Sequence, residues 1–329
     1  MKNSINRRQA LVAGTGLLGT AALPAWAQAQ GYPNRPITLV VPFAPGGAVD
    51  ISARAVADRL GKALGQTVVV ENRAGAGGAI GSSMVARAPA DGYTLVVTSQ
   101  STHVVGPAVT PNLPYNAETD FSPITLIDRL ANVLLINASL PVRDFAEFVT
   151  YVKANPGKWN YASSGNGSVA HLSMELLNAK LGLDIAHVPY KGAGSALTDL
   201  LGGLVQVSWN NLTSNLPNIA NGKLRALAVA APQRVALLPS VPTFDELKLP
   251  DLNLTSWTGL AAPARTPDPI INRLYEAMRS VLSDPATKAA WEQRGAIVPE
   301  AITPAQYRQE ISQRIQFFKD VVRTNKIVL

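Results

Sequence analysis

The chain has 329 residues and no cysteine. Disulfide bonds, thiolate nucleophiles and cysteine-ligated metals are therefore excluded. Histidine is also scarce, since the sequence contains only His103, His171 and His187. No group of His, Asp and Glu residues shows the spacing of metal ligands, so we expect neither a metal nor a cofactor.

The sequence also lacks the glycine motifs that bind nucleotides. Gly75 and Gly77 begin like a dinucleotide-binding fingerprint, but Ile80 occupies the position of the required third glycine. No phosphate-binding loop ends in Lys-Ser or Lys-Thr. We interpret this stretch as a glycine turn that opens a helix packed closely on a sheet.

The signature of a serine hydrolase is incomplete. Ser168 and His171 stand three residues apart, but the sequence has no Gly-x-Ser-x-Gly elbow. Ser168 is a good N-cap for the helix that follows. We therefore expect no catalytic residues, and a periplasmic hydrolase is the least favoured alternative.

Charge is modest and gives no sign of a nucleic-acid partner. The formal net charge is +7, and the basic residues Lys2, Arg7 and Arg8 account for three of these charges, which leaves +4 for the rest. Runs of Lys and Arg, and aromatic residues interleaved with basic ones, are both missing. Residues 10–25 are apolar, but this run is too short for a membrane span, which needs about 20 residues.

Residues 1–30 predict an export signal. A basic start precedes the apolar run, no acid occurs before Asp50, and residues 25–29 contain two small-x-small cleavage patterns. The pair Arg7-Arg8 is typical of a twin-arginine signal. Because Ala10 stands where Phe is usual, the general secretory route stays open. Cleavage near residues 27–30 would leave a periplasmic protein.

The rest of the chain alternates apolar runs with helical periodicity, which is typical of an α/β protein. Strands are expected at residues 37–41, 67–70, 94–98, 123–128, 133–136, 159–163, 185–190, 205–209, 224–230 and 257–263. The near succession of 123–128 and 133–136 suits a chain that crosses between two domains, and 257–263 suits a second crossing. In the C-terminal part, Thr266, Asp284 and Thr303 each precede a proline and predict helix starts.

One glycine-rich loop joins the first strand to a helix and predicts an anion site. Its candidate contact residues are Phe43, Ala44, Pro45, Gly46 and Gly47. Glycine lets a ligand approach the backbone closely, and the unpaired amides at a helix N-terminus favour a carboxylate. The alternative is an ordinary connection between a strand and a helix. Asp50 either pairs with a ligand ammonium group or only caps its own helix.

A second loop repeats this pattern of strand, glycine turn and helix N-terminus. It consists of Ser164, Gly165, Asn166, Gly167 and Ser168. If the two loops belong to different domains and face each other across a cleft, they could hold the two ends of a dicarboxylate.

Polar residues also follow three predicted strands. Ligands of open α/β sheets bind beyond the carboxyl ends of the strands. The candidates there are Ser99, Gln100, Ser101 and His103 after the third strand, Tyr190, Lys191 and Gly192 at the carboxyl end of residues 185–190, and Trp209 and Asn210 at a further strand end. For His103, a purely structural role is the alternative.

Eight segments in order resemble one family over nearly the whole chain beyond residue 30. They are residues 32–37, 41–50, 70–78, 90–95, 112–115, 120–124, 188–192 and 222–228. These segments are similar to the Bug-type extracytoplasmic receptors of tripartite tricarboxylate transporters. Members of this family hold a carboxylate ligand through backbone amides of a loop that matches residues 43–47 of this chain. Residues matching 164–168 and 190–192 line the cleft from the second domain.

The resemblance implies a type II periplasmic binding fold, in which two α/β domains are joined by two crossing strands and close on a ligand between them. Domain 1 would comprise residues 31–130 and 253–329, and domain 2 residues 131–252. A monomeric, non-catalytic receptor is implied, which passes a small organic carboxylate to two integral membrane transporter subunits. A sensor that signals to a membrane partner is the alternative.

One departure from the family bears on the ligand. Many members carry Phe-Asp-Asn where this chain has Trp209-Asn210-Asn211. A carboxylate there could pair with a ligand ammonium group, which the neutral amide of Asn210 does less well. We therefore predict a preference for acids that lack an amino group. The Trp209 indole either stacks on an aromatic acid or packs in the core.

Overall fold

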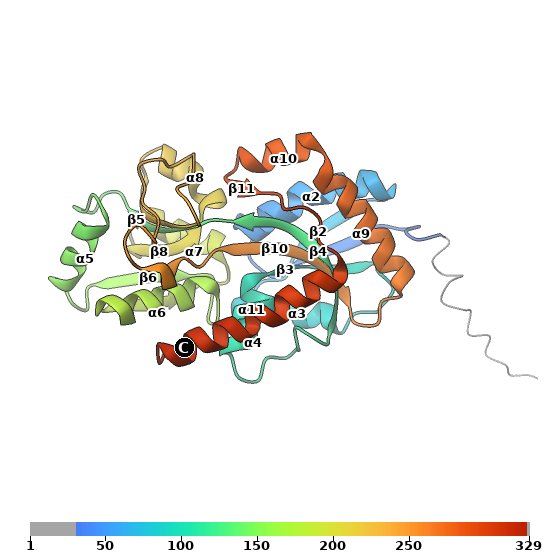
Figure 1. The fold of residues 1–329 in the computed structure, drawn as a ribbon, viewed down its shortest axis with the longest axis horizontal. Helices are drawn as coiled ribbons and strands as arrows, with labels where there is room; N and C mark the ends of the chain where they lie inside the picture. The colour runs from blue at the N-terminus through green and yellow to red at the C-terminus, as the bar shows by residue number, and fades with distance from the viewer. Residues whose placement is uncertain (1–30, 328–329) are drawn as a thin grey trace, which may run out of the picture. The chain divides into compact units, whose positions relative to one another are not determined.

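The computed structural model describes residues 31–327, so the predicted export signal lies outside the described residues. From Pro33 onward the chain forms one compact unit built around two β-sheets, each with its own helices (Figure 1). None of the helices described between residues 31 and 327 combines the length and the apolar character that a membrane span requires.

The first sheet contains the N-terminal strands and the last two strands of the chain, in the order β11-β4-β10-β3-β1-β2. The bounds are β1 Ile37–Val41, β2 Val68–Asn72, β3 Thr94–Ser99, β4 Phe121–Leu130, β10 Ser256–Pro263 and β11 Ala296–Ile297. Strand β1 pairs in parallel with β2 and β3, whereas β10 is antiparallel to β3 and β4. The carboxyl ends of β1, β2 and β3 therefore lie at one edge of the sheet.

The second sheet has the order β7-β6-β8-β5-β9. The bounds are β5 Asn132–Asn137, β6 Trp159–Ser163, β7 Ile185–Pro189, β8 Val207–Asn211 and β9 Leu224–Ala230. Strand β6 is parallel to β7 and β8, while β5 runs antiparallel to β8 and β9. This mixed α/β architecture with two sheets is the predicted one.

Two passages of the chain connect the sheets. Strand β4 leads into β5 with only Ala131 between them, and the chain returns through residues 253–255 into β10. The side chain of Asn132 joins the two passages, since its Nδ2 donates to the Leu254 carbonyl at 2.6 Å and to Ser256 Oγ at 3.0 Å.

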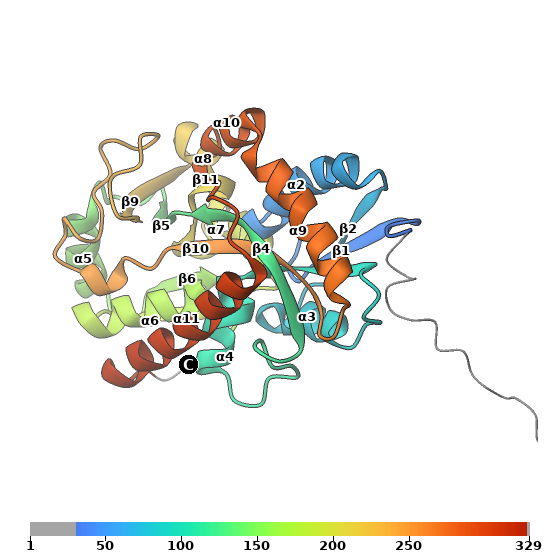
Figure 2. The same ribbon diagram turned by 45° about the vertical axis from the view of Figure 1, so that its right-hand side comes forward.

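The helices lie around the two sheets (Figure 2). Those near the first sheet are α2 Ala48–Leu64, α3 Ala79–Ala86, α4 Gly106–Val109, α9 Asp268–Ser283, α10 Pro285–Glu292 and α11 Pro304–Thr324. Those of the second sheet are α5 Phe145–Lys153, α6 Val169–Leu181, α7 Ala193–Leu201 and α8 Leu212–Ala220. Short helical turns occur at Ala76–Gly78, Ser101–Val105 and Pro250–Leu252.

Helix α11 shows how an amphipathic pattern decides packing. Tyr307, Ile311, Ile315 and Phe318 recur every three or four residues and are all buried. The Tyr307 hydroxyl reaches Thr98 Oγ1 at 2.6 Å, so the phenol is buried with a hydrogen-bond partner. The helix begins after Thr303, as predicted, with a capping box of Thr303 and Gln306.

One local prediction is wrong, and several helical segments were not predicted. Thr266 is not the N-cap of α9, because its Oγ1 donates to the Pro263 carbonyl and the helix starts at Asp268, after Pro267. The chain after β3 forms a π-helical turn, Ser101–Val105, which was not predicted. Helices α7 and α8 were not predicted, and α8 contains Pro217, which lacks the amide that a helix interior uses.

Candidate functional site

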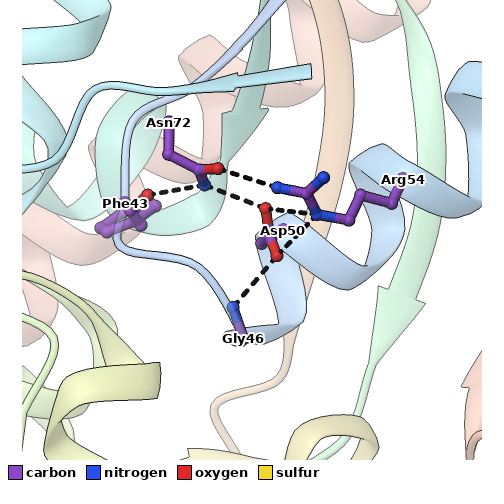
Figure 3. A network of polar contacts seen from close by, with 5 residues as sticks. All are labelled: Phe43, Gly46, Asp50, Arg54 and Asn72. Atoms are coloured by element: carbon purple, nitrogen blue, oxygen red, sulfur yellow. Dashed lines mark hydrogen bonds and ion pairs between the residues drawn. The ribbon is translucent and has the colours of Figure 1, made fainter. Parts of the chain in front are cut away.

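The loop after β1 is held in shape by the carboxylate of Asp50 (Figure 3). Asp50 is buried, and it accepts hydrogen bonds from the Gly46 amide at 3.0 Å, from Arg54 Nε at 3.1 Å and from Asn72 Nδ2 at 2.9 Å. The same Nδ2 donates to the Phe43 carbonyl at 3.0 Å. The loop is thereby tied to β2 and to its own helix.

These contacts explain the charge state of Asp50. Burial raises the pKa of its carboxyl, but the hydrogen bonds from Arg54, Gly46 and Asn72, together with the Arg54 charge, outweigh burial and lower the pKa below its usual value. The Asp50 carboxylate thus accepts its hydrogen bonds from the loop, from α2 and from β2. The N-cap of α2 is Gly47, so Asp50 braces the loop without being the N-cap.

The loop after β6 is organised by serine and histidine side chains. Ser168 is the N-cap of α6, as predicted, and its Oγ accepts from the His171 amide at 3.2 Å. Ser163 Oγ accepts from the Gly165 amide at 3.1 Å and shares a 2.6 Å hydrogen bond with His187 Nε2. His171 and His187 stack with ring centroids 3.9 Å apart.

Both imidazoles are neutral at pH 7. Burial lowers the pKa of His187 to about 4. The pKa of His171 is also lowered to about 4, by burial and then by the nearby His187. Two neutral rings can lie in van der Waals contact without charge repulsion, which keeps the loop from Ser163 to Ser168 in place.

The two glycine loops contact different segments of the chain. The loop after β1 lies against the turn after β7, where the Ala44 amide donates to the Lys191 carbonyl at 3.2 Å. The loop after β6 lies against the segment after β3, where the Val169 amide donates to Ser101 Oγ at 3.2 Å. Each glycine loop therefore meets a different partner across the two sheets.

Glycine is required at these meeting points. A Cβ on Gly194 would lie closer than 3.0 Å to the Pro45 carbonyl oxygen, and a Cβ on Gly77 would lie equally close to the Asn166 carbonyl oxygen. Real Cβ atoms do not approach backbone atoms that closely. The missing side chains let backbone meet backbone between the two sheets.

Between these contacts lies a cavity of about 40 Å³, which we call the inner cavity. Its lining is rich in hydroxyl and amide groups and includes no charged side chain. The lining residues are Ser101, Asn132, Ser163, Ser164, Val169, Ala170, Ala193, Ala196, Ser208, Trp209, Asn210, Asn211 and Ser256.

Several helices begin at the inner cavity. Its lining includes the first residues of α6 and α7, Val169 and Ala193, and Asn211, the N-cap of α8. Ser101, at the start of the π-helical turn, also lines it. Helix N-termini carry partial positive charge, although the Val169 amide here donates to Ser101 Oγ and the Asn211 amide to Asn210 Oδ1. The convergence of these termini suits an anionic group without a lysine or arginine in the lining.

Four of the predicted site residues line the inner cavity: Ser101, Ser164, Trp209 and Asn210. Asn210 is buried, and its Oδ1 accepts from the Asn211 amide at 2.8 Å. The Trp209 indole packs in the core instead, stacked on Phe244 with centroids 4.8 Å apart. Alternation along β8 puts the Asn210 side chain on the opposite face of the sheet from the indole.

The other predicted residues after β3 make structural contacts. Gln100 Nε2 donates to the Thr255 carbonyl at 2.7 Å, and Ser99 Oγ lies 3.1 Å from Thr102 Oγ1. His103 is fully buried, with its ring 4.6 Å from that of Phe121 and its Nδ1 2.9 Å from Thr102 Oγ1. Burial lowers the pKa of His103 to about 3, so the ring is neutral.

The inner cavity also contains residues that sequence reasoning missed, including Asn132, Ser163, Ser208 and Ser256. Ser163 ends a predicted strand, so the rule on strand ends could have found it. Asn132 and Ser256 lie at the two passages between the sheets, 124 residues apart, and no local pattern connects them.

Comparison with known proteins gives these features a context. A sequence model described as the tripartite tricarboxylate transporter family receptor matches residues 52–326. Protein BugT of Bordetella pertussis is 39% identical over 307 residues, which cover 93% of this chain and 94% of BugT.

Two solved structures are similar over most of the chain. The structure of periplasmic binding protein BugD has a TM-score of 0.87 and 34% identity, and the match covers 90% of this chain and 99% of BugD. MatC from Rhodopseudomonas palustris, solved with bound malate, has a TM-score of 0.84 and 36% identity, with coverage of 88% and 100%. The chain therefore belongs to the Bug-type receptors of the tripartite tricarboxylate transporter family.

Proposed function

We propose that this receptor captures a small organic carboxylate at the inner cavity and delivers it to two integral membrane subunits of a tripartite tricarboxylate-type transporter. The observation that carries the proposal is the convergence of helix N-termini and neutral hydrogen-bond donors on one cavity between the sheets. A buried anion needs such donors, because leaving it unpaired is costly. The malate held by MatC supports the same ligand class.

The ligand would be enclosed between two domains. Domain 1 comprises residues 31–130 and 253–329, and domain 2 residues 131–252. At about 40 Å³, the inner cavity has room for roughly three water-sized groups, about the size of one carboxylate. A whole dicarboxylate therefore requires the sheets to move apart slightly, and the Asn132 connection marks where the chain would bend.

The predicted contacts divide into two sets. Ser101, Ser164 and Asn210 would meet the ligand directly, together with Asn132, Ser163 and Ser208. The loop from Phe43 to Gly47 and the turn Tyr190-Lys191-Gly192 would close over it through the contact between Ala44 and Lys191. Asp50 would act indirectly by fixing the first loop.

Asn210 favours acids without an amino group. A ligand ammonium group in the inner cavity would meet no carboxylate, because no charged side chain lines it. Burying an unpaired charge is unfavourable. We therefore expect malate and succinate to bind more tightly than aspartate.

The test is a thermal-shift screen of the exported form, residues from about Gln28 onward, against organic acids, amino acids and aromatic acids at neutral pH. A ligand at a hundredfold excess over its Kd stabilises the folded state by about 2.7 kcal/mol. Mass spectrometry of the denatured protein first checks for an acid retained from the host. If no carboxylate raises the Tm of acid-free protein, the proposal is wrong.

A sensor that signals to a membrane partner would bind the same acids. Uptake of the labelled acid by cells that carry or lack the receptor separates the two functions. Loss of uptake without the receptor supports transport, whereas unchanged uptake with loss of an acid-dependent response supports sensing.

A further inference from the structure

A second and much larger cavity lies beside the inner one. It has a volume of about 860 Å³, and we call it the outer cavity. Helix α3, the segment from Ser101 to Tyr115 and the loop at Asn166 and Gly167 form its walls. Ser101 lines both cavities, and its hydrogen bond with the Val169 amide lies between them.

The walls of the outer cavity combine apolar surface with positive charge. Ile80, Met84 and Leu113 contribute apolar side chains, and Ile80 is 55% exposed despite its size. Arg73 and Arg87 also line it, and no Asp or Glu side chain does. This composition fits a ligand with an apolar body and an anionic end.

Arg87 is the more available of the two cations. Arg73 forms an ion pair with Glu71, which compensates its charge. Within residues 31–327, Arg87 forms no ion pair, and its Nη2 only donates to Ser83 Oγ at 3.2 Å. Four of its five guanidinium N–H donors therefore remain for a ligand.

We propose that the outer cavity binds the carboxylate of an organic acid with an apolar body, with Arg87 holding the carboxylate and Ile80, Met84 and Leu113 contacting the body. This chemistry has two sources. The acid is either a separate monocarboxylate or the far end of a long dicarboxylate whose near end occupies the inner cavity. The second source rests on the proposed function, and the first does not.

Either acid would contact Asn166 and Gly167 in the loop after β6 of the second sheet, and also α3 beside the first sheet. A ligand that touches both sides favours the arrangement in which they are in contact. Occupation of the outer cavity should therefore raise affinity at the inner cavity.

The experiment titrates the exported form with succinate, octanoate and decanedioate by calorimetry, in the wild type and in Arg87→Gln. The matched control is Arg294→Gln, because Arg294 is an exposed arginine that lines neither cavity. Ile80→Ser removes an exposed part of the apolar wall, so it leaves the core unchanged.

If octanoate is the ligand type, it binds the wild type both alone and with saturating succinate, and Arg87→Gln and Ile80→Ser each weaken it by about fivefold or more. If the long diacid is the ligand type, only the affinity for decanedioate falls in these variants, and succinate competes with decanedioate for the inner cavity. Succinate affinity stays unchanged in every variant. Equal affinities in Arg87→Gln and Arg294→Gln for both octanoate and decanedioate would overturn the proposal, while succinate binding would still report on the inner cavity.

Discussion

Adding a single methyl group at Gly194 should weaken ligand binding without preventing the protein from folding. Gly194 lies near the start of α7, its φ is not positive, and a Cβ there would be closer than 3.0 Å to the Pro45 carbonyl oxygen and 3.3 Å from the Gly47 amide nitrogen. Gly194→Ala therefore suits the helix but not the contact with the loop after β1. We expect a folded protein that binds its acid weakly.

The size of the effect follows from two opposing terms. Alanine is favoured over glycine in a helix by about 1 kcal/mol, so α7 is not weakened. Overpacking costs about 1–3 kcal/mol, and here it applies only when the Pro45 carbonyl touches α7. If binding requires that contact, ligand affinity falls by about 5- to 150-fold.

The assay compares Kd by calorimetry, and Tm without ligand, for the wild type, Gly194→Ala and Gly202→Ala. Gly202 ends the same helix, and a Cβ there would make only ordinary contacts, 3.5 Å from the Thr198 carbonyl oxygen and 3.7 Å from that of Asp199. Only Gly194→Ala should lose affinity. An unchanged Kd in folded Gly194→Ala would show that the loop after β1 does not close against α7 when the ligand binds.

Three further predictions concern charge. Asp50→Asn should lower the free energy of unfolding by about 1–3 kcal/mol and weaken acid binding, because it disturbs three hydrogen bonds that brace the loop; Asp58→Asn, exposed on the same helix, should change urea unfolding little. Asn210→Asp should lower the affinity for malate relative to that for aspartate by tenfold or more in calorimetry, which corresponds to about 1.4 kcal/mol. The buried carboxylate would repel malate but pair with the ammonium group of aspartate. Stability should fall as pH drops from about 6.5 toward 3, because the folded-state pKa of His103 is about 3 and the unfolded chain takes up protons first. His103→Gln should flatten the pH dependence of urea unfolding by at most about 1.4 kcal/mol per pH unit; an equal slope in both proteins would refute this.

Local patterns predicted most elements because they depend on neighbours in sequence. The strand at Ile37–Val41, the helix capped by Ser168 and the helix that starts after Thr303 all lie where expected. The failures have local causes too. Helix α8 contains Pro217, a residue that is unfavourable inside a helix, and was not predicted. Thr266 is a typical capping residue, but its hydroxyl donates to the Pro263 carbonyl instead.

The sequence by itself predicted an α/β receptor of the tripartite tricarboxylate transporter family, because the ordered loop motifs and the alternation of strands and helices depend on residues close together in the chain. The tertiary structure alone decided which loops meet and which polar side chains line the inner cavity. Ser101, Asn132, Ser163, Ser208 and Ser256 come together only through the pairing of distant strands. Register and strand order depend on contacts between remote residues, and a local periodicity contains no information about them.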